Sequence, residues 1–483
     1  MLDFRPILLV NGLLLTTLGA AMLIPTLVDL SAGHSDWGVF AASTLLTLFM
    51  GVSLALTNWG SGDRLSLKEA FLLVVMAWIL LPAFSALPLT FSGLNLSYTD
   101  AYFEAMSGLT TTGATVIVGL DDAPPGILLW RSLLQWLGGL GIVFMAIALL
   151  PMLQVGGMQL FKVEAFDTAE KVLPSAAQIA GSLSSLYIAF TFFCALFLWS
   201  SGMDAFDAIN HAMTSIATGG FSTHDASIGY FDNAAIDIVL IMAMIVGSIP
   251  FLLYIQAVQG KPLALWKDSQ VRVFLSILVL LVLCLTIYQN SYEINDGLGE
   301  RVLYASFNVV SILTGTGYTN HDYASWGSFV VVLFFVIMFI GGCAGSTSCG
   351  VKIFRLQVLM ASMHAQIKQI VHPHGVFVPR YNGRPITDSV AASVMGFFFL
   401  FFFCFGIIAI LLNLTGLDFL TSVSAAGTTI SNVGPGLGDI IGPMGTFAPL
   451  PDASKWILSV SMLIGRLEVF TVLVLLSPSF WRN

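Results

Sequence analysis

The chain alternates long apolar runs with short polar ones, and ten of the runs are long enough to cross a bilayer core of about 30 Å as helices. The ten runs occupy residues 7–30, 38–58, 69–91, 126–150, 181–201, 234–258, 273–290, 328–349, 390–413 and 455–478. This pattern predicts an all-α polytopic membrane protein.

After the first two runs, the remaining eight come in pairs, and a moderately apolar segment too short to cross lies inside each pair. These segments are residues 100–112, 207–219, 304–316 and 421–433. Each leads into a short motif built around a glycine: TTTGAT (110–115), ATGGFS (217–222), TGTGYT (314–319) and SNVGPG (431–436). We therefore expect each pair to cross, dip into the membrane and cross back.

The four motifs align on one glycine each, Gly113, Gly220, Gly317 and Gly434, with separations of 107, 97 and 117 residues. Six positions earlier a hydroxyl residue recurs: Ser107, Thr214, Ser311 and Thr428. Such agreement in a diverged chain indicates an internal fourfold repeat. Every repeat starts on the same side, so we expect a pseudo-fourfold axis along the membrane normal, around a central pore. The predicted units are two N-terminal helices (1–62) and four pore repeats (63–155, 156–262, 263–385 and 386–483).

Composition and charge narrow the function. The chain is 57% hydrophobic and only 9% charged, which excludes a soluble protein. With a cytoplasmic N-terminus, 14 of the 18 basic residues fall on the cytoplasmic side, which also places the C-terminus there and makes the dips enter from outside. These 14 are Arg5, Arg64, Lys68, Lys162, Lys171, Lys261, Lys267, Arg272, Lys352, Arg355, Lys368, Arg380, Arg384 and Arg482.

The predicted outer segments are acidic, for example at Asp121, Asp225 and Asp322, which favours a cation over an anion. The net charge of −9 argues against a nucleic-acid partner. The sequence carries no HExxH, nucleophile-elbow or Walker motif, so we do not expect an enzyme.

A half-helix that ends in a glycine-centred turn can direct backbone carbonyls toward a central axis, because glycine tolerates positive φ. Rings of carbonyls replace the hydration shell of a monovalent cation. Since the ligands are main-chain atoms, side chains are free to differ between repeats. The predicted cation ligands are the carbonyls of Thr111, Thr112, Gly113, Thr218, Gly219, Gly220, Gly315, Thr316, Gly317, Asn432, Val433 and Gly434.

Two features suggest a gate beneath these motifs. Residues 341–350, GGCAGSTSCG, are all small; they favour a broken helix whose loop blocks the pore, although close helix packing through Gly341 and Gly345 is the alternative. Arg466 falls near mid-membrane, where a charge faces a pathway or joins a structural ion pair. Glu468 is about 200° further round a helix, so the partner of Arg466 must lie on another helix. The predicted gate residues are Gly341, Gly342, Gly345, Ser346, Thr347, Ser348, Gly350 and Arg466.

Other polar groups have simpler interpretations. Glu104, His211 and Asn308 stand nine residues before their motif glycines and are expected to anchor the half-helices, whereas Ala425 breaks the series. The HPHG stretch (372–375) is expected at the surface, in a basic loop suited to docking a cytosolic regulator. The five cysteines, Cys194, Cys284, Cys343, Cys349 and Cys404, are expected to be buried small apolar residues.

The four motifs together resemble the pore loops of the Trk/Ktr/HKT potassium transporters. The two extra N-terminal helices, GGCAGSTSCGVK (341–352) and IGRLEVFTVLVLLSPSFW (464–481) are similar to the bacterial TrkH branch, and the resemblance covers essentially the whole chain. It implies a K⁺-translocating homodimer in the bacterial inner (plasma) membrane that also carries Rb⁺, contacts lipid, needs no tightly bound cofactor and works with a cytosolic nucleotide-binding TrkA-type subunit.

The resemblance also assigns roles to residues. It implies that a glycine at position 113 is associated with selectivity for K⁺ and that Arg466 points into the pore. The other motifs depart from the potassium-channel TVGYG, and only TGTGY comes close. A symporter coupled to H⁺ or Na⁺ is the alternative function; it would need ionisable groups on the pathway, and only Glu468 and Glu104 qualify.

Overall fold

The computed structural model describes residues 2–60, 66–145, 176–291 and 297–482. Within these ranges seven helices are long and apolar enough to cross a membrane, and up to nine spans result if each of two bent helix pairs counts as one. The eighth predicted run, 328–349, contributes only a shorter apolar helix, Ser328–Ile337. The prediction of a helical, multi-span membrane protein is confirmed.

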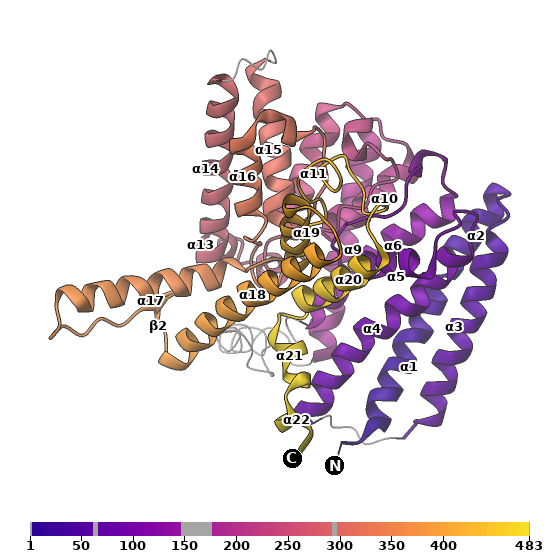
Figure 1. Cartoon of the computed structure of the whole chain (residues 1–483), viewed down its shortest axis with the longest axis horizontal. Helices are drawn as coiled ribbons and strands as arrows, with labels where there is room; N and C mark the ends of the chain where they lie inside the picture. The colour runs from indigo at the N-terminus through magenta and orange to yellow at the C-terminus, as the bar shows by residue number, and fades with distance from the viewer. Residues whose placement is uncertain (1, 61–65, 146–175, 292–296, 483) are drawn as a thin grey trace.

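The N-terminal spans lie side by side at one edge of the molecule (Figure 1). They are α1 (Phe4–Ala21) continued by α2 (Leu23–Ala32), then α3 (Trp37–Thr57) and α4 (Leu67–Phe91). A capping box starts α4: the Ser66 hydroxyl accepts from the backbone N–H of Glu69, and the Glu69 carboxylate accepts from that of Ser66 at 2.8 Å.

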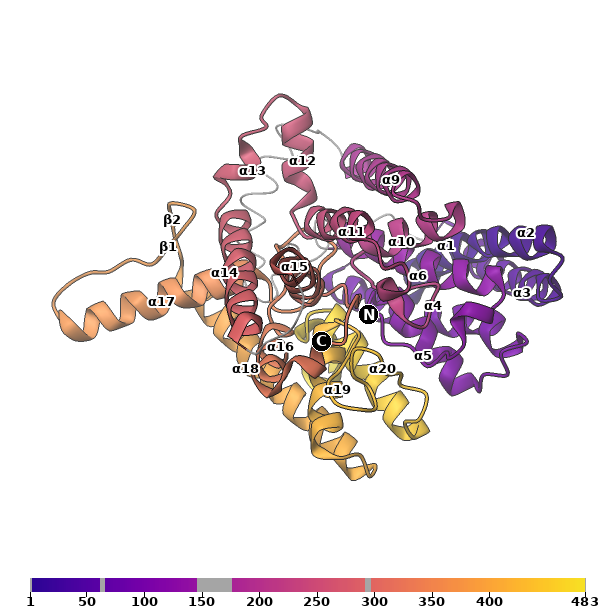
Figure 2. The same cartoon turned by 90° about the horizontal axis from the view of Figure 1, so that it is seen from above.

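The remaining long helices surround the centre of the molecule, where four half-helices meet (Figure 2). The long ones are α6 (Pro125–Phe144), α9 (Ala176–Ser200), α14 (Ser269–Ser291) and α18 (Asp388–Leu414). Shorter helices lie among them: α11 (Ala234–Gly247), α12 (Phe251–Val258), α16 (Ser328–Ile337), α20 (Asp452–Arg466) and α21 (Phe470–Leu476). The half-helices are α5 (Tyr98–Leu109), α10 (Ala205–Ile216), α15 (Leu298–Thr314) and α19 (Phe419–Ser431). Short connecting helices are η1 (Leu120–Asp122), η3 (Ser227–Tyr230), α13 (Ala264–Lys267), η4 (Tyr323–Trp326) and α22 (Pro478–Arg482).

Two predicted spans are bent rather than straight. The run 234–258 bends by 94° between α11 and α12, where Pro250 cannot donate a backbone hydrogen bond. The run 455–478 bends by 113° between α20 and α21, where Glu468 and Val469 have φ of +58° and +42°. The helical-face argument for Glu468 is therefore wrong, because α20 ends at Arg466.

The second long run of the predicted third repeat, 328–349, also stops being helical early. Helix α16 ends at Ile337, and residues 339–352 are irregular apart from an isolated bridge between Ile340 and Val351. The broken-helix prediction for this segment is confirmed, and the alternative of helix packing through Gly341 and Gly345 is wrong.

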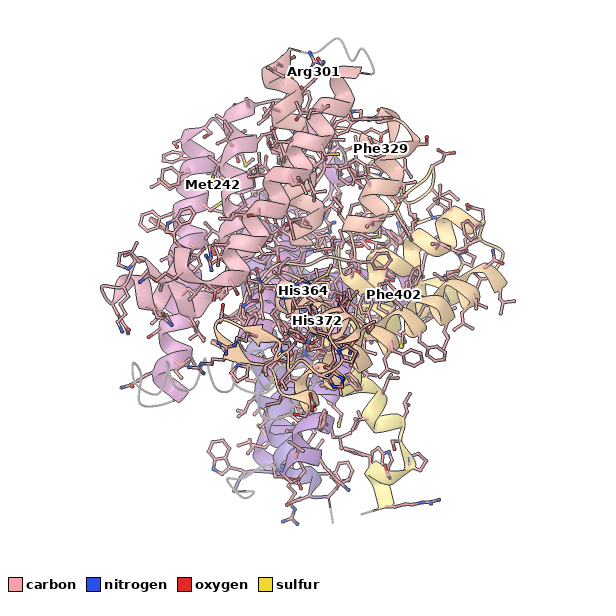
Figure 3. The ribbon with its side chains drawn as sticks, turned by 90° about the vertical axis from the view of Figure 1, so that its left-hand side faces the viewer. Met242, Arg301, Phe329, His364, His372 and Phe402 are labelled. Atoms are coloured by element: carbon pink, nitrogen blue, oxygen red, sulfur yellow. The ribbon has the colours of Figure 1, made fainter. Side chains whose placement is uncertain are left out.

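Helix α17 (Ile353–Val371) and a small hairpin project away from the rest of the molecule (Figures 1 and 2). The hairpin pairs β1 (Arg380–Tyr381) antiparallel with β2 (Arg384–Pro385) around Asn382 and Gly383, both at positive φ, as a two-residue Asn-Gly turn requires. Figure 3 shows His364 and His372 on this projection. His372 and His374 are exposed, as predicted for the HPHG stretch.

The beginning of α1 and the end of α22 lie at the same end of the molecule (Figure 1), which is compatible with both termini on one side. Some predictions lie outside the described residues: the last five positions of the run 126–150, and the basic residues Arg64, Lys162 and Lys171.

Candidate functional site

Each half-helix ends at its motif with the same pair of backbone hydrogen bonds. The residue two positions before the motif glycine donates to the carbonyl three residues earlier, as Thr111 does to Gly108 at 3.0 Å. The residue one position before donates to the carbonyl five residues earlier, as Thr112 does to Ser107 at 2.9 Å. The second bond recurs from Gly219 to Thr214, Thr316 to Ser311 and Val433 to Thr428. All four half-helices therefore end in a Schellman cap, and the recurring hydroxyl residue supplies its carbonyl to that cap.

The backbone of each motif enters the left-handed region twice. The residues two positions before the motif glycine have φ between +50° and +75°: Thr111, Thr218, Gly315 and Asn432. The motif glycines Gly113, Gly220, Gly317 and Gly434 follow with φ between +79° and +110°. Left-handed backbone is rare for a β-branched residue, and such strain gathers at functional sites.

The motifs close into a ring. Each motif glycine faces the carbonyl oxygen of the residue just before the glycine of the next motif, and the last faces the first. The pairs are Gly113 with Gly219, Gly220 with Thr316, Gly317 with Val433 and Gly434 with Thr112. A Cβ at any of the four glycines would overlap the facing oxygen. The close approach explains why glycine occupies this position in all four motifs.

A buried ion pair supports the first motif. The Glu104 carboxylate accepts from Arg131 Nε at 2.8 Å, from the Thr115 hydroxyl at 3.0 Å and from the backbone N–H of Val116 at 2.8 Å. Arg131 also donates to the Ser222 carbonyl at 2.8 Å, which joins the first motif to the second. Glu104 therefore anchors the segment, as predicted.

The equivalent residues act in the same way. His211 contacts the Ser222 hydroxyl at 3.0 Å, and Asn308 donates to the Asn320 side chain at 2.7 Å. In the fourth half-helix Ala425 has no polar side chain, and the preceding residue, Ser424, anchors the segment instead. The Ser424 hydroxyl accepts from the backbone N–H of Leu437 at 3.1 Å. Each half-helix is thus tied to the irregular segment that follows its own motif.

Sequence reasoning missed two side chains that hold the ring. Gln135 on α6 donates to the Gly219 carbonyl at 2.6 Å and accepts from the Phe221 N–H at 3.0 Å. Asn432 donates to the Thr112 hydroxyl and to the Met462 carbonyl, both at 2.9 Å. Gln135 could have been noticed as an amide inside a predicted apolar span.

The segment 341–350 lies against three of the four motifs. The Thr347 hydroxyl lies 3.2 Å from that of Thr218, and the Ser348 hydroxyl donates to the Thr314 carbonyl at 2.6 Å. Cys349 Sγ lies 3.6 Å from the Thr111 hydroxyl. The structure therefore brings the predicted gate segment together with the predicted cation ligands.

The same segment satisfies the backbone groups that the bend between α11 and α12 leaves free. The N–H of Thr347 donates to the Gly247 carbonyl and that of Cys343 to the Ser248 carbonyl, each at 3.1 Å. In return, the N–H of Phe251 donates to the Gly345 carbonyl at 3.0 Å. Irregular backbone at membrane depth needs such partners within the protein.

Arg466 reaches this segment from the end of α20. It is 3% exposed, and its Nη1 donates to Cys349 Sγ at 2.6 Å while its Nη2 lies 3.3 Å from the Gly138 carbonyl. Arg466 makes no ion pair with a carboxylate among the described residues. Cys349 is free and buried, as predicted, although its sulfur accepts a hydrogen bond; the expectation that Cys284 is buried is wrong, because Cys284 is exposed.

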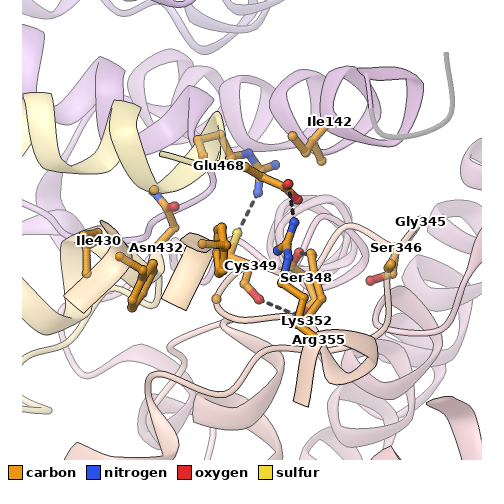
Figure 4. Close-up of a pocket in the computed structure, with 16 residues that line it drawn as sticks. Ile142, Gly345, Ser346, Ser348, Cys349, Lys352, Arg355, Ile430, Asn432 and Glu468 are labelled. Carbon is orange, nitrogen blue, oxygen red and sulfur yellow. Dashed lines mark hydrogen bonds and ion pairs between the residues drawn. The ribbon is translucent and has the colours of Figure 1, made fainter. Parts of the chain in front are cut away.

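Glu468 instead pairs with Arg355 of α17, whose guanidinium also lies 3.9 Å from the ring centre of Phe397. Lys352 donates to the Ser348 carbonyl. Figure 4 shows Cys349, Lys352 and Glu468 around one small cavity of about 30 Å³, on the side of the motifs where the segment 341–350 lies. Two basic residues and one acidic residue thus converge here beside Arg466.

A second cavity, of about 70 Å³, lies on the other side of the ring and is lined by all four motif glycines. His224 at its rim contacts Asp207 at 3.2 Å and Asp121 at 2.5 Å. Burial disfavours the protonated imidazole, but the hydrogen bonds to these two carboxylates outweigh it and raise the pKa of His224. The ring therefore separates two cavities.

The described side chains include no cluster of three or more His, Cys, Asp or Glu residues able to hold a metal ion.

Four half-helices that end inside a bundle of apolar spans define an integral membrane protein with re-entrant segments, a design found in proteins that move ions. The chain belongs to the TrkH family of cation transport proteins, whose family model matches residues 38–482. This is a family of transport proteins and not of enzymes.

Relatives that match the chain over nearly their full length support its membership of this family. The chain is 44% identical to the Trk system potassium uptake protein TrkI of Halomonas elongata, over 99% of this chain and 97% of that protein. It is 39% identical to the Trk system potassium uptake protein TrkH of Escherichia coli, over the whole of both. The crystal structure of the potassium transporter TrkH from Vibrio parahaemolyticus superposes with a TM-score of 0.92 at 38% identity, again over both whole chains.

Proposed function

We propose that this chain takes up K⁺ across the bacterial inner membrane through a channel-like pore at the ring. The observation that carries the proposal is the closed ring of glycine–carbonyl contacts from Gly113 to Gly434. The relatives named as potassium uptake proteins match the chain over its whole length, which supports K⁺ as the cation.

The chemistry of the ring suits a weakly hydrated monovalent cation. Alternation of left-handed and ordinary backbone lets successive carbonyls point the same way, and carbonyl oxygens replace the hydration shell of K⁺. The negative ends of four helix dipoles also converge on the ring, since each half-helix ends there. We assign the cation sites to the twelve motif residues named above, with no further cofactor.

We assign the gate to residues 341–350 together with Arg466. The segment contacts three motifs from the inner side, and the guanidinium adds a fixed positive charge that opposes a resting cation at that place. Movement of the segment would release the hydrogen bonds that Thr347 and Ser348 make to the motifs.

A channel-like mode agrees better with the ion pairs than coupled symport does. Glu104 is bound to Arg131, and Glu468 to Arg355, so neither carboxylate is free to carry a coupling ion without breaking a pair. Reversal potentials of the K⁺ current, measured against H⁺ and Na⁺ gradients, separate the two modes. A current that shifts with either gradient would favour symport.

The proposal includes the wider assembly. We assign the chain to a homodimer with both termini in the cytoplasm and pore repeats bounded at residues 63, 156, 263 and 386. A TrkA-type nucleotide-binding subunit would dock on the cytoplasmic side, where α17 and its hairpin project from the molecule (Figure 1).

The direct test is uptake of ⁸⁶Rb⁺ by the purified chain in liposomes, with and without a TrkA-type subunit, against competing K⁺ and Na⁺. We expect uptake that K⁺ suppresses and an equal concentration of Na⁺ does not. Uptake no greater than in protein-free liposomes in both arms would refute the proposal.

A further inference from the structure

A large cavity of about 360 Å³ lies between α1, α4 and α6, beside the end of half-helix α5. Its walls are Leu14 and Leu18 of α1, Leu73 and Trp78 of α4 and Gly138 of α6, among others. Leu14 is 38% exposed and Leu18 only 3%, so the cavity runs from the lipid-facing surface to the interior.

The residues that line the cavity are almost all apolar, so they do not favour a polar ligand. Thr17 is the one hydroxyl residue among the described lining residues, and its hydroxyl donates to the Leu13 carbonyl at 3.0 Å within α1. A buried water needs 2–4 polar partners, and an apolar cavity of about 150 Å³ already stays dry and binds benzene. The occupant of this larger cavity is therefore apolar.

Two lining residues also touch Arg466. The Gly138 carbonyl is the acceptor for Nη2 at 3.3 Å, and the Trp78 ring centre lies 5.8 Å from the guanidinium carbon, within cation–π range. The cavity wall is thus also part of the pocket that holds the arginine.

We propose that an acyl chain of a membrane lipid enters between α1 and α6, fills this cavity and supports Gly138 and Trp78 in their contacts with Arg466. The surrounding hydrocarbon supplies this ligand without a dedicated partner, because the walls are membrane-spanning helices. The effect on Arg466 rests on the proposed function; occupation of the cavity does not.

The chain offers a matched pair of variants for the test. A Cβ at Gly141 of α6, a lining residue, meets nothing within 4 Å, and the same holds at Gly406 of α18, away from the cavity. Gly141→Leu therefore fills the cavity without displacing backbone, whereas Gly406→Leu adds the same side chain elsewhere.

The experiment uses a phospholipid with a diazirine near the end of one acyl chain, incorporated into proteoliposomes of the full chain. After illumination, mass spectrometry maps the labelled peptides. We expect label on the lining residues of α1, α4 and α6 in the parent and in Gly406→Leu, and loss of that label in Gly141→Leu. Equal labelling in Gly141→Leu, or label confined to other surfaces, would overturn the proposal.

The second readout is ⁸⁶Rb⁺ uptake by the same samples. We expect Gly141→Leu to differ from the parent and Gly406→Leu not to differ. Lost labelling with unchanged uptake would overturn the link to Arg466. If the parent transports no Rb⁺ at all, the proposed function fails, while the labelling result still decides whether a lipid chain occupies the cavity.

Discussion

The guanidinium of Arg466 donates a hydrogen bond to the sulfur of Cys349 at 2.6 Å. This contact joins the end of α20 to the irregular segment 341–350, and Cys349 in turn lies beside the Thr111 hydroxyl. The described contacts of Arg466 otherwise reach only carbonyl oxygens and the Trp78 ring. Cys349 is therefore the side chain that fixes the arginine under the ring.

Cys349→Ala is expected to raise basal Rb⁺ flux, because Arg466 loses its hydrogen bond to the Cys349 sulfur and can move off the ring. Cys349→Ser keeps a hydrogen-bond acceptor for Arg466, so its flux should stay near that of the parent. Cys284→Ala, at an exposed cysteine of α14, is the control. Flux in Cys349→Ala equal to that in Cys284→Ala would contradict this role.

Removing Arg466 itself should raise Rb⁺ flux more than Cys349→Ala does. Arg466→Ala is expected to raise flux through the pore, since the fixed positive charge that opposes a resting cation is gone. Deletion of part of residues 341–350 should raise it further by removing the obstruction itself. The measurement is tracer flux normalised to the amount of folded protein. Flux at or below the parent level in both variants would rule out the gating assignment.

Gly113→Ser is expected to relax discrimination between K⁺ and Na⁺. Gly113 has φ of +85°, and a Cβ there would overlap the Gly219 carbonyl oxygen, so the ring must shift. Gly119→Ser is the control, because Gly119 has a similar φ of +81° with open space around its Cβ. The check is Na⁺ competition in Rb⁺ uptake. Unchanged competition in Gly113→Ser would argue against a cation site here.

The Glu104–Arg131 pair should dominate local stability. Removing one partner of a buried pair leaves an uncompensated charge and costs about 3–5 kcal/mol. Glu104→Ala is therefore expected to lower the melting temperature strongly. Asp204→Ala removes an exposed helix N-cap, whose carboxylate accepts from the backbone N–H of Phe206 at 3.0 Å, and should cost only about 1 kcal/mol. Similar melting temperatures for the two variants would mean that Glu104 does not hold the first motif.

Stability should fall as pH rises above 6.5 because of His224. Its pKa is raised above the ordinary 6.5, so the protonated form stabilises the fold fully below pH 6.5, and this contribution is lost as pH rises through the raised pKa. His224→Gln should flatten this part of the melting-temperature profile, whereas His364→Gln on the projecting α17 should not. Parallel profiles for parent and His224→Gln would exclude this effect.

The sequence predicted the repeated element well because backbone geometry was the repeated feature. A glycine stands wherever a Cβ would overlap the facing carbonyl, and that constraint is visible as a column in the sequence. The apolar runs likewise predicted the spans, since a bilayer crossing needs a minimum length.

What escaped prediction depended on three-dimensional neighbours. An apolar run does not indicate where a helix bends, so the sequence did not predict the change of direction after Arg466. For the same reason it did not predict the ion pair between Glu468 and Arg355. Cys349 looked like any buried small residue until a guanidinium was found beside it. In the sequence Gln135 is a single polar residue in an apolar run, and only the fold shows that its amide donates a hydrogen bond to the Gly219 carbonyl.

The ring follows the order of the chain, and its closing contacts are between Gly434 and Thr112 and between Asn432 and Thr112, the latter 320 residues apart in sequence. During synthesis, three quarters of the ring exist before the partner of Thr112 has been made. A nascent chain that has not yet inserted its last repeat therefore carries an incomplete ring with no wall on one side. The ring that we propose as the cation pathway is therefore complete only after the final segment docks.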